Sequence, residues 1–246
     1  MKKKKFLCFI SARGGSTGIK NKNIMSFCGK PLISWTILQA KKSKILEDIH
    51  ISTDSIKIAK IAEKYGGKIP FIRKKNLANK NTSKFLVWKN ALLDIEKKKK
   101  IKYDYFFDLD CTNPLRSPND IDKMINHFLK NSKNIDALIT VSNSRKNPYF
   151  NMLEKNNSNF FKLSKKLIRW PTSRQTSPDV YDQVASMYLL KTDFLRKKTK
   201  LYDGNLKGYL LKDYQNFDID SQLDYKIVSF LFKKYYLKKT KKFKNV

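Results

Sequence analysis

The 246-residue chain has few cysteines and few histidines, and both shortages restrict its chemistry. Its three cysteines, Cys8, Cys28 and Cys111, include no C-x-x-C pair, which argues against a disulfide framework or a zinc site and favours free thiols in a reducing cytosol. His50 falls in an expected strand and His127 in an expected helix, neither beside a partner motif, so we expect structural roles. No Ser-His-Asp order with a nucleophile elbow occurs, and hydrolase chemistry has no support.

Long apolar runs are also missing. None approaches the ~20 residues that span a membrane. The basic start, Met1 to Lys5, resembles the beginning of a signal peptide, but the apolar stretch after it ends at Ile10, short of the roughly 7–15 residues of a signal core. Because 41% of the residues are hydrophobic and 13% aromatic, the composition predicts a globular protein. We expect it to be soluble and cytoplasmic, with no membrane partner.

Arginine is scarce in an otherwise very basic chain. The formal net charge is +32, yet only seven of the 53 basic residues are arginine. Bidentate recognition of phosphates and bases favours arginine, whereas the lysines are scattered along the whole chain. We interpret them as a compositional bias rather than a dedicated nucleic-acid surface, although the charge draws anionic substrates to any cleft. A nucleic-acid-binding protein is the alternative from another class, and the segment from Tyr235 to Lys244 is its best feature.

The glycine-rich stretch from Ser11 to Asn23 is the most informative part of the chain. It follows an apolar run, residues 6–10, that predicts a buried strand. Glycines let backbone N–H groups approach phosphates closely, and Arg13 and Lys22 add positive charge at both ends. The glycine spacing fits neither a Walker loop nor a dinucleotide fingerprint. The stretch therefore predicts a site for a nucleoside triphosphate, with a plain turn as the alternative.

Strand and helix patterns alternate along the chain. Expected strands cover residues 6–10, 48–53, 103–110, 137–141 and 185–190, with a short extended piece at Phe71-Ile72. Expected helices cover residues 31–40, 58–62, 84–97, 120–130 (capped by Asn119) and 222–232. This alternation predicts an α/β fold with a mostly parallel sheet in three layers, in which ligands sit at the carboxyl ends of strands. The glycine-rich stretch, Asp54 and Asp110 all fall at such ends.

Two regions break the pattern. Residues 142–182 are polar, contain three prolines and lack periodicity, which predicts a flexible insertion or an interaction arm. The segment from residue 233 to 246 is basic, and we expect it to be frayed.

Asp218-Ile219-Asp220 is the second chemical signal. Alternate residues of an extended segment point the same way, so the two carboxylates can hold one hard cation. Mg²⁺ prefers one or two carboxylates together with substrate phosphates. The alternative is that Asp220 or Ser221 simply caps the helix that follows.

Together these motifs resemble the acylneuraminate cytidylyltransferase family, the CMP-sialic acid synthetases. The matching segments run in the family's order from near residue 6 to near residue 230. They are Ala12-Arg13-Gly14-Gly15-Ser16, Lys22-Asn23, Gly29-Lys30-Pro31-Leu32-Ile33, Ile51-Ser52-Thr53-Asp54-Ser55, Pro70-Phe71-Ile72-Arg73, Asp108 to Arg116, Asn147-Pro148-Tyr149, Arg174-Gln175 and Phe217 to Asp220. The segment from Asp108 to Arg116 is most similar to enzymes that act on legionaminic acid-like sugars.

The resemblance implies a Rossmann-like domain that transfers CMP from CTP to the anomeric hydroxyl of an acidic nine-carbon keto sugar and releases pyrophosphate. It implies Mg²⁺ as cofactor, bound by Asp218 and Asp220, and CTP and the sugar as partners. It also implies a homodimer in which residues 142–182 reach across the interface to the sugar site. The nucleotidyltransferase domain would then occupy residues 1–235, with a basic tail at 236–246.

The resemblance also assigns the remaining site residues. The residues expected to bind the nucleotide and its phosphates share the first loop: Ala12, Arg13, Gly14, Ser16, Lys22 and Asn23. Charge on Arg13 and Lys22 would stabilise the leaving pyrophosphate. Arg73 is expected at the cytidine side, with a surface salt bridge as its alternative. The residues expected to meet the sugar are Asp110, Thr112, Arg174 and Gln175, although Arg174 has an ordinary surface role as its alternative.

Three positions depart from the family pattern. Thr17 stands where the family usually has lysine, Asp110 where it often has glutamine, and Val184 where it has asparagine. An acid at 110 would bind metal or alter sugar selectivity. The alternatives within this class are a 3-deoxy-octulosonate-type nucleotidyltransferase and an inactive relative.

Overall fold

The computed structural model describes residues 3–16, 18–79 and 81–238. The expectations for Met1 and Lys2, for Thr17 and for the tail beyond residue 238 lie outside them. The described residues form a six-stranded sheet in the order β10-β6-β9-β5-β1-β4. Its strands are β1 (Phe6–Ser11), β4 (Ile49–Ser52), β5 (Tyr105–Leu109), β6 (Ala137–Asn143), β9 (Tyr181–Lys191) and β10 (Leu206–Leu210). Only β9 runs antiparallel to its neighbours in this described sheet, so the mostly parallel sheet is confirmed.

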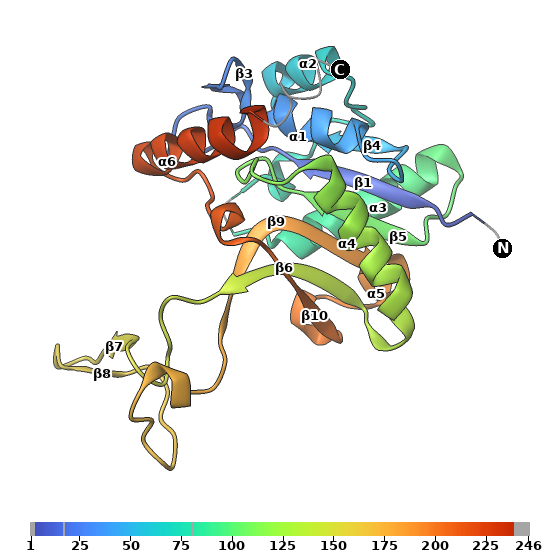
Figure 1. Cartoon of the computed structure of the whole chain (residues 1–246). Helices are drawn as coiled ribbons and strands as arrows, with labels where there is room; N and C mark the ends of the chain where they lie inside the picture. The colour runs from blue at the N-terminus through green and yellow to red at the C-terminus, as the bar shows by residue number, and fades with distance from the viewer. Residues whose placement is uncertain (1–2, 17, 80, 239–246) are drawn as a thin grey trace.

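Helices cover both faces of the sheet (Figure 1). Along β1, Cys8 and Ile10 join one core cluster while Leu7 and Phe9 join the other, as the two-residue period of a strand requires. The first cluster includes α1 (Leu32–Lys41), α2 (Ile56–Lys64) and α4 (Pro118–Asn131), and the second includes α3 (Lys84–Lys99) and α5 (Thr192–Lys197). The expected three layers are confirmed. No helix of the described residues has the length and apolar character needed to cross a bilayer.

A third core cluster joins the end of the chain to its beginning. Here α6 (Gln222–Phe232) packs on α1 beside the small hairpin of β2 (Ser26–Phe27) and β3 (Lys30–Pro31). Tyr236 stacks on Phe232 with ring centroids 4.6 Å apart and meets the edge of Trp35. For residues 233–238 the expectation of fraying is therefore wrong, because this aromatic contact continues the helix through a π-helical turn, Lys233–Leu237.

Several local expectations need correction. The cap of α4 is Ser117 rather than Asn119, since the Ser117 side chain accepts the Asp120 N–H. Phe71 and Ile72 form no strand. The elements α5 and β10 were not expected, because both are short and lack a clear apolar period. The 3₁₀ turns, also too short to predict, are Lys22–Ile24, Lys75–Leu77, Ser132–Asn134, Arg174–Thr176, Leu201–Asp203 and Asp213–Gln215.

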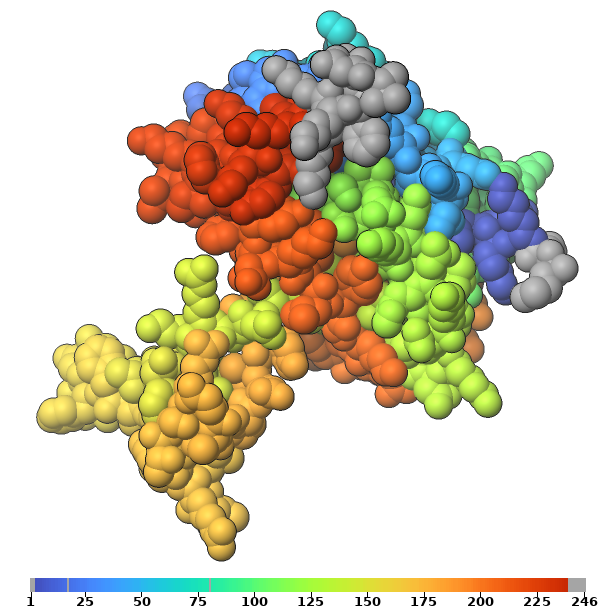
Figure 2. Space-filling model, viewed as in Figure 1, coloured from blue at the N-terminus to red at the C-terminus, as the bar shows by residue number. Residues whose placement is uncertain are grey.

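Residues 144–180 form an arm that projects from the body (Figures 1 and 2). It carries a two-stranded hairpin, β7 (Leu153–Lys155) and β8 (Phe161–Leu163), and leaves large apolar side chains exposed. These side chains are Met152, Leu153, Phe160, Phe161, Ile168 and Trp170. The arm follows β6 and precedes β9, so both of its ends join the sheet.

Candidate active site

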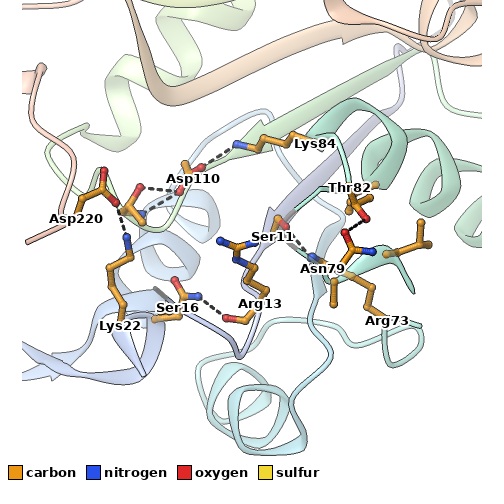
Figure 3. Close-up of a pocket in the computed structure, with 15 residues that line it drawn as sticks. Ser11, Arg13, Ser16, Lys22, Arg73, Asn79, Thr82, Lys84, Asp110 and Asp220 are labelled. Carbon is orange, nitrogen blue, oxygen red and sulfur yellow. Dashed lines mark hydrogen bonds and ion pairs between the residues drawn. The ribbon is translucent and has the colours of Figure 1, made fainter. Parts of the chain in front are cut away.

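A cavity of about 350 Å³ lies beside the glycine-rich loop, at the carboxyl ends of β1 and β5 (Figure 3). This is where ligands bind in open sheets of this kind. Of the residues predicted for the site, the cavity brings together Arg13, Ser16, Lys22, Asn23, Arg73, Asp110, Thr112 and Asp220. The loop and the distant acidic segment therefore meet at one hollow, as the sequence predicted.

Backbone and amide contacts fix the shape of the loop. Ala12 is buried and donates its N–H to the Ser52 carbonyl at 3.0 Å. The Gly14 N–H donates to Oδ1 of Asp54 at 2.8 Å, so this amide is already engaged. The Asn23 amide donates to the Arg13 carbonyl at 3.0 Å. Ala12, Gly14 and Asn23 thus support the loop, while Arg13 and Lys22 extend into the cavity (Figure 3).

Gly18 brings the loop against the acidic segment. A Cβ atom built at this position would lie only 2.1 Å from the carbonyl oxygen of Asp220. Any side chain would force the two segments apart, so the close approach requires glycine. The Lys22 ammonium reinforces the contact by an ion pair of 2.7 Å with Oδ1 of Asp220.

Arg73 lies in the wall of the cavity and is only 6% exposed. Its guanidinium donates to the Ser11 hydroxyl at 2.6 Å, to the Ser52 hydroxyl at 2.9 Å and to the Ser52 carbonyl at 2.6 Å. Burial lowers the pKa of Arg73. The alternative of a surface salt bridge is therefore wrong, and Arg73 instead adds a buried positive charge beside the cavity.

Ile219 is a buried anchor between the two acids of the C-terminal motif. It is fully buried, and its N–H donates to the Thr112 carbonyl at 2.9 Å. The helix that follows is capped by Ser221, whose hydroxyl accepts the Asp224 N–H at 3.2 Å. Of the two capping alternatives, the structure thus shows Ser221, and the Asp220 carboxylate, paired with Lys22, lines the cavity instead.

The acid pair has the chemistry of a cation site. Oδ1 of Asp218 is buried without a hydrogen-bond partner among the described residues. Burial, together with the negative charge of Asp110, raises the pKa of Asp218 to about 6. The described residues contain no group of three His, Cys, Asp or Glu side chains placed to hold a metal. Two carboxylates suit Mg²⁺ when phosphates and water supply its other ligands, so the donor set fits.

Asp110 follows β5 and is tied to two neighbours. Its Oδ1 accepts the Thr112 N–H at 3.0 Å and the Thr112 hydroxyl at 2.9 Å, while Oδ2 pairs with the Lys84 ammonium at 2.8 Å. Lys84 also pairs with Oδ2 of Asp108 at 2.7 Å. No sequence pattern marked Lys84, because it is one lysine among very many.

Two predicted sugar-binding residues lie elsewhere. Arg174 and Gln175 are exposed in the arm and are not part of the cavity of their own chain. The Arg174 guanidinium donates to the Ser144 carbonyl at the base of the arm, so it supports the arm.

Other residues of the site were missed in the sequence. Asn79 and Thr82 line the cavity, and the Thr82 hydroxyl bonds to Oδ1 of Asn79 at 2.9 Å. They lie in a polar loop without periodicity, so nothing in the local pattern marked them. Val184, at the position of the missing asparagine, is buried at 2% exposure.

Comparison with known proteins identifies relatives that match most of the chain. The family model described as Cytidylyltransferase matches residues 7–244. The chain is 43% identical over 227 residues to "Post-translational flagellin modification protein B" of Campylobacter coli, covering 92% of this chain and 94% of the relative. It is 41% identical over 225 residues to "CMP-N,N'-diacetyllegionaminic acid synthase" of Campylobacter jejuni, a match that covers 92% of this chain and 94% of that relative. In fold it is similar to the solved structure of CMP:2-keto-3-deoxy-manno-octonic acid synthetase complexed with CTP, with a TM-score of 0.68 and 14% sequence identity. The superposition covers 94% of this chain and 99% of that structure.

Proposed function

The chain belongs to the cytidylyltransferase family, and we propose that it transfers CMP from CTP to an acidic nine-carbon keto sugar, releasing pyrophosphate. The observation that carries the proposal is the cavity shared by the glycine-rich loop and the Asp110 and Asp220 segments. Similarity over 92% of the chain to a legionaminic acid synthase favours a legionaminate-like acceptor. The three free cysteines fit a reducing cytoplasm.

In the proposed reaction the anomeric hydroxyl oxygen of the sugar attacks the α-phosphorus of CTP. A P–O bond forms to the sugar, the bond to the β-phosphate bridge breaks, and the hydroxyl proton is released. Arg13 and Lys22 would hold the phosphates and stabilise the charge that develops on pyrophosphate. Buried Arg73, at the same wall as Asn79 and Thr82, would help to seat the nucleoside.

Mg²⁺ belongs to this proposal, with Asp218 and Asp220 as the residues that would hold it. The ion would supply charge neutralisation at the phosphates. Asp218 must be ionised for this role. Because its pKa is raised to about 6, a bound cation would have to compete with a proton for this carboxylate at mildly acidic pH.

The proposal includes a homodimer formed through the arm. Ile168 and Trp170 are exposed on the arm, which projects away from the body (Figure 2), so in an isolated chain their apolar surface would meet water. In such a dimer Arg174 and Gln175 would belong to the sugar site of the partner rather than to their own. The exposed charge of Arg174 could then pair with the acidic group of the sugar.

The direct test is product formation. The purified protein is incubated with CTP, Mg²⁺ and a panel containing N-acetylneuraminic acid, N,N'-diacetyllegionaminic acid and 3-deoxy-octulosonic acid, and CMP-sugars are identified by mass spectrometry. We expect the legionaminic acid to give the highest yield. Exclusive use of 3-deoxy-octulosonic acid would replace the proposed acceptor, and the absence of any CMP-sugar would refute the reaction.

A further inference from the structure

Lys84 occupies a position where a positive charge is unfavourable. It is the first residue of α3, and a helix N-terminus carries partial positive charge that favours acidic residues. Ser83 already caps this helix, since its hydroxyl accepts the Leu86 N–H at 3.2 Å. The lysine therefore does nothing for its own helix. Such a local conflict is expected where a residue serves a site.

The partners of Lys84 lie on the sheet instead. Its ammonium is 2.7 Å from Oδ2 of Asp108 and 2.8 Å from Oδ2 of Asp110. Asp108 and Asp110 alternate along one extended segment and point the same way. The ammonium also lies 4.5 Å from the ring centroid of Tyr188 and 5.4 Å from that of Trp88. Lys84 thus places one positive charge between two adjacent carboxyl groups, of which Asp108 is fully buried and has its pKa raised by that burial.

These contacts fix Asp110 in one orientation. One carboxylate oxygen faces Lys84, and the other accepts both hydrogen bonds from Thr112. Burial raises the pKa of Asp110, but the charge of Lys84 and the hydrogen bonds from Lys84 and Thr112 together lower it below its ordinary value, so the group is ionised. A carboxylate oxygen can accept more than one hydrogen bond, which leaves Asp110 with capacity toward the cavity that it lines (Figure 3).

Resting on the proposed function, we propose that Lys84 is the positioning residue for the sugar end of the cavity. It holds Asp110 as a fixed, acceptor-only group that takes a hydrogen bond from a hydroxyl or N–H of the acidic sugar. It also offsets negative charge that would otherwise repel the carboxylate of that sugar. The selected acceptor therefore carries a donor group opposite Asp110. Glutamine, which both donates and accepts, would not impose this requirement.

The test uses steady-state kinetics with the best sugar of the panel, together with calorimetry for CTP. We expect Lys84→Met to raise the KM for the sugar about 10-fold or more, while the Kd for CTP changes less than about threefold. Asp110→Asn should raise the sugar KM similarly. The double variant Lys84→Met/Asp110→Asn keeps the net charge of the cluster, and its sugar KM should equal that of Asp110→Asn alone. Lys97→Met, an exposed lysine of the same helix, is the matched control.

The double variant also limits misfolding, because it leaves only the Asp108 carboxyl without its lysine partner, whereas Lys84→Met alone would leave both Asp108 and Asp110 without it. Its thermal unfolding temperature should therefore fall less than that of Lys84→Met. If the two single penalties multiply in the double variant, or if Lys84→Met weakens CTP and sugar equally, Lys84 does not act through Asp110 and the inference fails. A wild type that makes no CMP-sugar removes the proposed function and this inference together. If the wild type makes a CMP-sugar and Lys84→Met has an unchanged KM for the sugar, this inference fails and the proposed function stands.

Discussion

The cavity and the arm differ in how their side chains are held. In the cavity, groups far apart in sequence are tied to one another: Lys22 pairs with Asp220, 198 residues away. In the arm, residues bond mainly to one another, as where the Asn147 side chain accepts the Tyr149 N–H at 2.9 Å, and Trp170 is 63% exposed. The cavity is therefore preorganised by its own chain, whereas the arm has apolar surface that only another surface can cover. Chemistry and assembly should accordingly respond to different mutations.

The largest effect should come from the acid that faces the cavity. Asp220→Asn should lower Mg²⁺-dependent pyrophosphate release at least about 100-fold, because it removes one of the two proposed cation ligands. Its side chain is 77% exposed, so thermal unfolding should hardly change. Asp213→Asn, an exposed acid nearby in sequence, serves as the control and should remain active. Full turnover by Asp220→Asn would rule out the metal role.

The phosphate-binding side of the cavity should be sensitive to charge in the loop. Arg13→Ala should weaken CTP binding about 10-fold, since a hydrogen bond to a charged group contributes about 1.5–3 kcal/mol. Lys20→Ala changes an exposed lysine of the same loop outside the cavity lining and should leave the affinity unchanged. Calorimetry measures both. Equal affinities for the two variants would show that Arg13 does not bind the phosphates.

Substitutions in the arm should change the oligomeric state of the protein and leave its nucleotide affinity unaltered. Replacing Ile168 and Trp170 together by serine should shift the protein from dimer to monomer in analytical ultracentrifugation, because both side chains are exposed in the single chain. CTP affinity should persist, since neither residue lies near the loop. Lys166→Ser is the control on the same segment. A wild type that sediments as a monomer would contradict the proposed assembly.

The smallest effect concerns stability, and its sign follows from the raised pKa of Asp218. The folded pKa of about 6 exceeds the ordinary 3.8, so ionising this buried group costs stability. The cost is absent below about pH 4, grows as the pH rises toward 6 and is complete above it. Asp218→Asn should therefore raise Tm at pH 8 by about 5 °C or less, while both proteins match near pH 4. Calorimetric scans at the two pH values test this, and a lower Tm for the variant at pH 8 would contradict it.

The parts of the fold that sequence reasoning found are those with strong periodicity or turn chemistry. The apolar run of β1, the glycine loop and the Asp218-Ile219-Asp220 motif were all located in advance, because each pattern has a local physical cause. The π-helical turn containing Tyr236 was missed, since its stability comes from Trp35, far away in sequence. Lys84 was missed for a similar reason, because its role depends on partners that only the folded sheet brings near.

Ile219 carries a last consequence. This single apolar side chain joins the segment of Asp218 and Asp220 to the core shared by Trp35 and the C-terminal helix. If proteolytic trimming or a bulky fusion weakened the packing of that helix, we expect the turnover rate to fall before the protein unfolds. Engineering of the chain's end should be judged by kinetics before melting curves.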